Sequence, residues 1–112
     1  MNTVGQIQDN LREGMYAGDP NACARDSAVL SGHYAYISDK LSAILQAKPA
    51  IWNQMRSSSG IKSDTACERV WQATEMGIEE TKYKLQLKSL EKQMAALRAL
   101  LQLYQTEARN IT

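Results

Sequence analysis

The sequence predicts an all-α protein whose main body is a long antiparallel helical hairpin, preceded by a short N-terminal helix. Two long segments carry apolar residues at alternating spacings of three and four, the spacing of helices that pack side by side. The 112 residues include 6 glycines and 2 prolines, fewer turn residues than a β protein needs. The length corresponds to one domain, and 44% hydrophobic and 22% charged residues are typical of a globular chain.

Residues 1–18 are predicted to contain a short amphipathic helix. Thr3 is a favourable N-cap residue, and Ala17-Gly18 ends the pattern. Four apolar residues between them follow one another at spacings of three or four and therefore share one helical face: Val4, Ile7, Leu11 and Met15.

Residues 19–112 are predicted to form the hairpin, with its first helix over about residues 20–56. Asp19-Pro20 is a helix start signal, because aspartate caps a helix and proline fits its first turn. Pro49 is expected either to end this helix or to kink it, and the apolar residues after it favour a kink. Serine-rich residues 57–63 are the expected loop. The apolar stripe of the helix consists of Leu30, Tyr34, Ile37, Leu41, Ile44 and Lys48.

The second hairpin helix is predicted over about residues 64–110, opening at Ser63 or Thr65. We expect this helix to be uninterrupted, with a rotation of its packing face near residues 77–85, where two stripes of different phase meet. The upstream stripe is Cys67, Trp71, Thr74, Ile78, Thr81 and Leu85. The downstream stripe is Tyr83, Leu87, Leu90, Met94, Leu97, Leu101, Tyr104, Ala108 and Ile111.

The second hairpin helix carries a broader apolar arc toward its C-terminal end than a two-helix contact uses. Either the N-terminal helix or another copy of the chain must cover this arc. A thin hairpin has much surface for its volume, and association is a usual remedy, so we expect a homo-oligomer. The expected interface residues are Leu85, Leu97, Leu100, Leu101, Leu103 and Tyr104.

The residues that usually carry catalysis or bind metals do not form a recognisable set. His33 is the single histidine and has no second ligand at helical spacing. Cys23 and Cys67 each lie near the start of a hairpin helix, at opposite ends, so we expect two packing cysteines and no disulfide between them. The chain is predicted to be no enzyme and to need neither metal nor cofactor.

Acidic residues cluster at Glu75, Glu79 and Glu80, which could in principle hold a cation. Lys82 and Lys84 follow at once, and Glu80 and Lys84 stand in the favoured i, i+4 order. A solvated, salt-bridged face is therefore the preferred interpretation.

Two basic surfaces are candidate nucleic-acid sites, although the net charge is only +1. Single-strand binders combine aromatic rings for base stacking with basic groups for phosphates. The alternative interpretation is that both tryptophans belong to the core of the hairpin tip and that the lysines form an ordinary solvated face. The surface at the tip would consist of Lys48, Trp52, Arg56, Lys62 and Arg69 with Trp71 nearby, and a second surface is the ridge of Lys84, Lys88 and Lys92.

Beside the helix pattern, residues 34–110 contain several distinctive polar segments. These are Lys62-Ser63-Asp64, Glu68-Arg69-Val70-Trp71, Thr74-Glu75-Met76-Gly77, Leu87-Lys88-Ser89-Leu90-Glu91-Lys92 and Glu107-Ala108-Arg109-Asn110. With the helix pattern, they resemble small helical phage proteins of the UvsY-like recombination-mediator type over roughly residues 34–110. The resemblance would imply a ring-like homo-oligomer that binds single-stranded DNA and helps to load a recombinase.

These observations lead to a ranked set of expected functions. The first is a cytoplasmic, oligomeric accessory protein of DNA recombination or replication, which binds single-stranded DNA and a protein partner such as a recombinase. The alternatives are a protein–protein adaptor or inhibitor that acts through a helical face, and a structural assembly component. The N-terminus lacks the basic start and apolar stretch of a signal peptide, and no apolar run reaches the ~20 residues of a membrane span.

Overall fold

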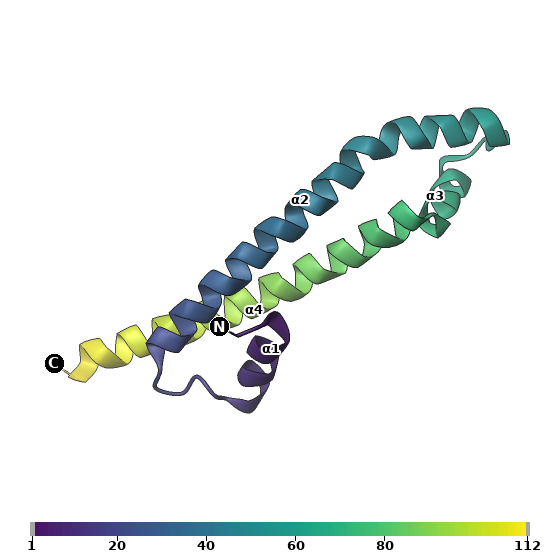
Figure 1. Cartoon of the computed structure of the whole chain (residues 1–112). Coiled ribbons are helices and arrows are strands. Elements are labelled where there is room, and N and C mark those ends of the chain that lie inside the picture. Colours follow the sequence, from purple (N-terminus) through teal and green to yellow (C-terminus); the bar gives the residue numbers. More distant parts are fainter. Residues whose placement is uncertain (1, 112) are drawn as a thin grey trace. The chain divides into compact units, whose positions relative to one another are not determined.

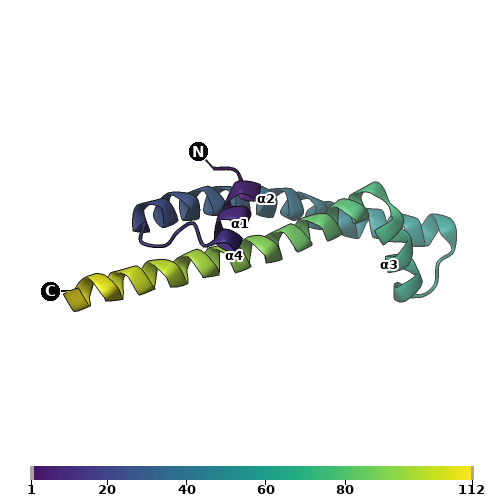
Figure 2. The same cartoon turned by 90° about the horizontal axis from the view of Figure 1, so that it is seen from below.

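The computed structural model describes residues 2–111 and is built from α-helices, with no strand among those residues. The helices are α1 (Val4–Glu13), α2 (Pro20–Ser59), α3 (Asp64–Ala73) and α4 (Glu75–Ile111), shown in Figures 1 and 2. The chain divides into two compact units. Unit 1 comprises Met1–Ala35 and Lys88–Thr112, and unit 2 comprises Tyr36–Leu87. The expected all-α class is confirmed.

The hairpin is confirmed, because α2 and α4 pair in opposite directions within unit 2. Leu41 and Leu45 of α2 line one hollow with Leu87 of α4, whereas the later Lys48 lies 3.2 Å from the earlier Glu80, which is an antiparallel arrangement. In unit 1 the two helices are also joined, since the hydroxyl of Tyr34 donates to Glu91 at 2.9 Å. None of the helices within residues 2–111 combines the length and apolar character that crossing a membrane requires.

Helix α1 begins as the sequence predicts and is shorter than the predicted 1–18 segment. The Thr3 hydroxyl accepts from the amide of Gln6, and the Thr3 amide donates to the Gln6 side chain at 2.8 Å. The helix ends at Gly14, whose φ of 68° is a left-handed conformation that glycine adopts without strain. Turns then lead to α2, and the side chain of Ile7 is fully buried in unit 1.

Helix α2 continues through Pro49 to Ser59, so this proline does not end it. Figure 1 shows the ribbon changing direction in its teal half, as expected for a kinked helix. The predicted loop at 57–63 is too long by three residues. The hydroxyls of Ser57 and Ser58 donate to the carbonyls one turn earlier, at 3.0 and 2.8 Å. These serines therefore belong to the last turn.

The uninterrupted helix expected over residues 64–110 is wrong, because the chain breaks at Thr74 into α3 and α4. The Thr74 hydroxyl accepts from the amide of Gly77 at 3.1 Å and donates to the carbonyl of Trp71 at 2.5 Å. A Cβ at Gly77 would overlap that carbonyl and lie 2.9 Å from the Cα of Gln72. Only glycine allows this close corner. Helix α3 itself opens with Ser63 as its cap, the first of the two predicted starts.

Each unit has its own buried core. In unit 1 the core includes Ile7, Tyr16, Cys23, Leu30, Leu90 and Leu97, and in unit 2 it includes Ile37, Ile44, Cys67 and Trp71. Both cysteines are free and buried, as expected for packing residues. Met1 and Thr112, and the side chain of Ile111 at the end of the expected stripe, lie outside the described residues.

Candidate functional site

Lys48, predicted to contact nucleic acid, is engaged inside unit 2. Its ammonium lies 3.1 Å from Glu68 and 3.2 Å from Glu80, and 5.3 Å from the ring centroid of Trp71. Burial alone would lower the pKa of Lys48, but the hydrogen bonds to both carboxylates outweigh it and raise that pKa. The lysine therefore neutralises buried acid and is not available to a phosphate, which corrects the prediction.

Glu80 is the centre of this cluster, with a side chain that is only 3% exposed. The indole Nε1 of Trp71 donates to it at 2.9 Å, and the ammonium of Lys84 lies 3.5 Å away. Burial opposes the charge of Glu80, but the bonds from Trp71 and Lys48 prevail, so its pKa is lowered. The cluster joins α2, α3 and α4 within unit 2 and has a structural role.

The two tryptophans of the predicted tip surface differ in exposure. Trp71 is fully buried, which confirms the core interpretation for that residue. Trp52 is half-buried, and the guanidinium of Arg56 lies 5.6 Å from its ring centroid. Arg56 also pairs with Asp64 and donates to a backbone carbonyl at 3.0 Å. Lys62 and Arg69 are exposed, and Arg69 lines one hollow together with Trp52.

The lysines of the second predicted basic surface are divided between the units, with Lys84 in unit 2 and Lys88 and Lys92 in unit 1. Lys84, Lys88 and Lys92 are all exposed on successive turns of α4. Glu75 and Glu79 of the acidic cluster are exposed as well. Among residues 2–111 there is no group of three or more potential ligands placed to hold a metal ion.

The residues predicted to form an oligomer interface divide into two groups. Leu85 is 62% exposed and Leu103 is 51% exposed, and Leu100 and Leu101 are half-buried. Leu97 is fully buried in the core of unit 1, so its assignment to an interface is wrong. The side chain of Tyr104 is likewise used within unit 1, where its hydroxyl donates to the carbonyl of Tyr16.

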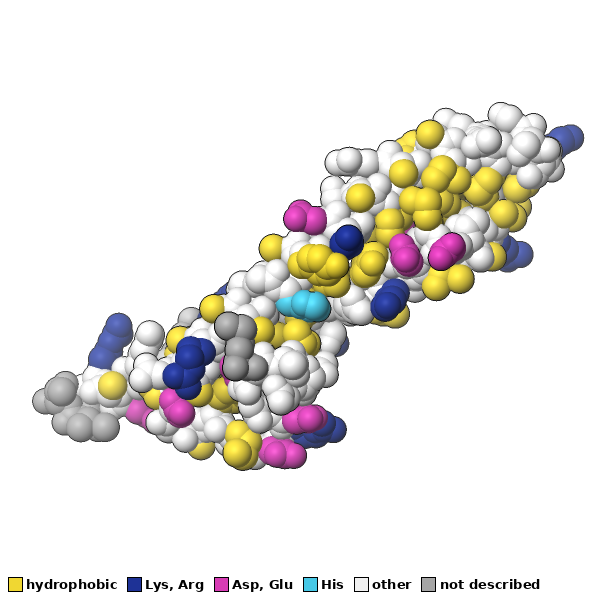
Figure 3. Space-filling model, viewed as in Figure 1, with side chains coloured by type: hydrophobic (Ala, Val, Ile, Leu, Met, Phe, Trp, Pro, Cys, Tyr) yellow, Lys and Arg dark blue, Asp and Glu magenta, His cyan; other side chains and the backbone are white. Residues whose placement is uncertain are grey.

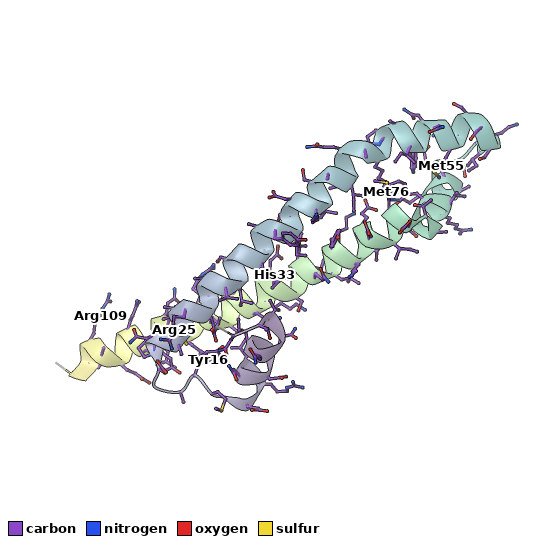
Figure 4. All side chains as sticks on the ribbon, in the orientation of Figure 1. Tyr16, Arg25, His33, Met55, Met76 and Arg109 are labelled. Carbon is purple, nitrogen blue, oxygen red and sulfur yellow. The ribbon has the colours of Figure 1, made fainter. Side chains whose placement is uncertain are left out.

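Unit 1 contains a large groove that the sequence analysis did not identify. Its volume is about 1270 Å³, and it lies between the first turn of α1 and one face of α2. Figure 4 labels Arg25 and His33 on α2, and His33 is the cyan side chain on the surface in Figure 3. Both side chains are exposed. The lining residues are Asn2, Thr3, Val4, Gly5, Ala22, Arg25, Asp26, Ala28, Val29, Gly32 and His33.

Asp26, buried beside this groove, holds the surrounding segments together. Its carboxylate accepts from the Asn2 amide at 3.0 Å and from the hydroxyl of Tyr16. Burial, followed by the neighbouring carboxylate, raises the pKa of Tyr16 to about 12. Burial also raises the pKa of Cys23 on the same helix. The segment before α1 and the turn after it are thereby both tied to α2, so the groove is preformed.

The groove is lined mostly by small and apolar side chains, and of its charged residues Arg25 is exposed and Asp26 is buried. Gly5, Ala22 and Gly32 allow another backbone to approach closely, and nothing lies within 4 Å of a Cβ built at Gly32. Buried Asp26 could have been a signal in the sequence, because it interrupts an otherwise small and apolar helical face. The arrangement suits the binding of an elongated, apolar ligand better than it suits catalysis.

Comparison of the chain with protein-family models, with curated proteins and with solved structures found no match. The expected resemblance to recombination mediators therefore stays a prediction.

Proposed function

We propose that the chain is a non-enzymatic protein-interaction module, which binds an amphipathic helix of a partner protein in the groove between α1 and α2. The observation that carries this proposal is the preformed groove of about 1270 Å³ in unit 1. Small-molecule sites usually enclose about 300–1,000 Å³. The α2 face from Ala22 to His33 corresponds to about 16 Å of helix at about 1.5 Å per residue. This length matches about three turns of a docked helix.

The lining also favours a helical ligand. Partner helices enter such grooves with apolar anchors at i, i+3, i+4 and i+7, and small residues at the floor let the two helices approach closely. Gly5, Ala22 and Gly32 supply this floor, with Val4 and Val29 as apolar contacts.

The charges at the groove favour acidic groups on the partner. Arg25 is exposed beside the groove. The carboxylate of Asp26 is already bonded to Asn2 and Tyr16 and adds little repulsion. An amphipathic helix with a glutamate or aspartate at its edge would complement this surface.

The test uses a variant that fills the groove. Gly32→Leu should be accommodated in the folded chain, because the space around Gly32 is open. Ala24→Leu, at an exposed position of α2 outside the lining, is the matched control. Amphipathic helical peptides selected from a displayed library against the wild-type chain should bind Gly32→Leu at least tenfold more weakly and Ala24→Leu unchanged. Failure to select any peptide, or equal binding to both variants, would overturn the proposal.

A second candidate function is the binding of single-stranded DNA by the lysine ridge of α4. It is supported by the exposure of Lys84, Lys88 and Lys92, and a cytoplasmic role beside a recombinase would depend on it. Replacing these three lysines with glutamine should abolish oligonucleotide binding at low salt and flatten its salt dependence. The control with the same change in charge replaces Lys40, Lys62 and Lys82. Equal loss in both triple variants would indicate unspecific attraction and reject the ridge.

A further inference from the structure

Unit 2 exposes two large aliphatic side chains on one face of α4. Ile78 is 58% exposed and Leu85 is 62% exposed. They are seven residues apart, which is about two helical turns, so both project from the same side. Glu80, which faces α2 and α3, lies about 200° around the helix from Ile78 at about 100° per residue. The two aliphatic side chains therefore form an outer face of α4, away from the packed side.

The outer face is also shaped to receive a neighbour. A hollow of about 590 Å³ lies between its aliphatic side chains, and Gln72 from the end of α3 forms part of the wall. A surface that alternates protruding aliphatic groups with a hollow can interdigitate with a like surface. The residues that line this hollow are Gln72, Ile78, Thr81, Lys82, Leu85 and Gln86. Within the described part of unit 2 the outer face is uncovered, since Ile78 and Leu85 both remain more than half exposed.

We infer that this face of α4 in unit 2 pairs with the same face of a second copy of the chain, with the two helices antiparallel. The distribution of charge on α4 favours an antiparallel second copy as the partner of this face. Exposed acids precede the midpoint of the face, at Glu75 and Glu79, and exposed Lys82, which lines the hollow, follows it.

An antiparallel second copy brings the acidic half of each helix beside the basic half of the other. A parallel copy would instead place acid beside acid and lysine beside lysine, which is unfavourable. The face is thus complementary to itself in one orientation, as a two-fold symmetric interface requires. This pairing is independent of the groove in unit 1.

The first test measures association. Sedimentation equilibrium of the full chain over a range of concentrations should show a dimer, and Leu85→Asp should raise its dissociation constant at least tenfold. Met15→Asp, at a residue in unit 1 that is 64% exposed, is the control and should leave association unchanged. Circular dichroism should show equal helix content in all three proteins. A chain that stays monomeric, or a dimer that Leu85→Asp does not weaken, would overturn the inference.

The second test measures orientation by disulfide cross-linking. Thr81→Cys lies at the midpoint of the face, so its two copies meet in an antiparallel pair and should form a covalent dimer under mild oxidation. Glu75→Cys lies near one end, and its copies should be too far apart to cross-link. The wild-type chain is the background control, since Cys23 and Cys67 are buried. Equally rapid cross-linking of Glu75→Cys would indicate a parallel pair and overturn the proposed orientation.

Discussion

Asp26 in unit 1 and Glu80 in unit 2 are both buried carboxylates, and their surroundings differ. Asp26 accepts hydrogen bonds from two neutral groups, the amide of Asn2 and the hydroxyl of Tyr16. Glu80 accepts from the indole of Trp71 and pairs with Lys48, with Lys84 nearby. Unit 1 thus uses its acid to attach the segments on either side of α1 to α2, whereas unit 2 uses its acid to join three helices through charge.

This difference between the two buried acids explains which surface remains uncovered in each unit. Around Asp26 the attached segments stand beside α2 without filling the space next to it, and the groove results. Around Glu80 the cluster is closed, because Lys48 lies over the ring of Trp71 and the α3–α4 corner approaches closely at Gly77. Unit 2 instead leaves its outer face open, with Ile78 and Leu85 exposed. The two units therefore offer different kinds of surface.

The largest expected effect on stability comes from adding a single methyl group at a glycine of unit 2, and the same change at a glycine of unit 1 provides the comparison. Gly77→Ala places a Cβ against the Trp71 carbonyl, and rigid backbone on both sides leaves little room to relax. We expect a loss of about 4 kcal/mol or more in the free energy of unfolding, at the upper end of single-substitution effects. Urea unfolding followed by circular dichroism would measure it.

Gly32→Ala is the matched change in unit 1. Nothing lies within 4 Å of the added Cβ, and alanine in a helix interior is favoured over glycine by roughly 0.5–1 kcal/mol. This variant should therefore be slightly more stable than the wild type. A Gly77→Ala protein of near wild-type stability would show that the corner is not as close as described.

The next largest effect compares the two acids directly. Glu80→Gln keeps an acceptor for Trp71 but removes the charge that balances Lys48, and breaking a buried pair costs about 3–5 kcal/mol. Because Lys48 retains Glu68, we expect about 3 kcal/mol. Asp26→Asn still accepts from neutral donors and should cost about 1 kcal/mol. Equal losses in urea unfolding would contradict the distinction between the two units.

The helices could be predicted from sequence because their signals are local. The stripe that includes Leu30, Ile37 and Ile44 identified the buried side of α2, and all three are buried. The caps at Thr3 and Asp19 were also readable, and both side chains accept backbone amides as expected. Periodicity and capping depend on residues a few positions apart, so they need no knowledge of the fold.

The corner and the groove could not be predicted because they depend on contacts between distant residues. Thr74 and Gly77 occur in continuous helices as well, and only the approach to the Trp71 carbonyl reveals a corner. Lys48 appeared to be a free surface charge until Glu80, 32 positions later, proved to be its partner. The groove combines residues of α2 with residues 2–5, some twenty positions earlier, and no local pattern in the sequence brings these two segments together.

The two units should lose stability at opposite ends of the pH scale, unit 2 at acid pH through Glu80 and unit 1 at alkaline pH through Tyr16. The pKa of Glu80 is lowered in the folded state from its ordinary value of 4.5, so its contribution is present above pH 4.5 and is lost as the pH falls through the folded pKa. The pKa of Tyr16 is raised from 10.0 to about 12. Its contribution is complete below pH 10.0 and is lost as the pH rises toward about 12, with a magnitude on the order of 2 kcal/mol.

Two variants test which residue causes the loss of stability at each end of the pH range. Glu80→Gln should reduce the loss of stability at acid pH, and Tyr16→Phe should reduce the loss at alkaline pH. Some alkaline loss should remain in Tyr16→Phe, because the pKa of Lys48 is also raised and its stabilisation disappears as the pH rises through that value. Urea midpoints measured at intervals between acid and alkaline pH provide the test. If Glu80→Gln loses as much stability at acid pH as the wild type, another group must cause the acid sensitivity.

The smallest expected effect compares the helix caps of the two units. Removing an N-cap hydroxyl costs roughly 0.5–2 kcal/mol, and α1 and α4 both begin with a threonine cap. Thr74→Ala should cost about 1 kcal/mol or slightly more, because its hydroxyl both accepts from Gly77 and donates to Trp71. Thr3→Ala should cost less, since its site is exposed and water can replace the lost acceptor.

Thr74→Ser keeps the hydroxyl and should recover most of the lost stability, which separates the cap from the packing of the methyl group. If Thr74→Ala and Thr3→Ala cost the same, the double hydrogen bond at the corner adds nothing. The tight approach of α3 and α4 would then depend on Gly77 alone, and the contrast between a closed unit 2 and an open unit 1 would rest on the buried charges.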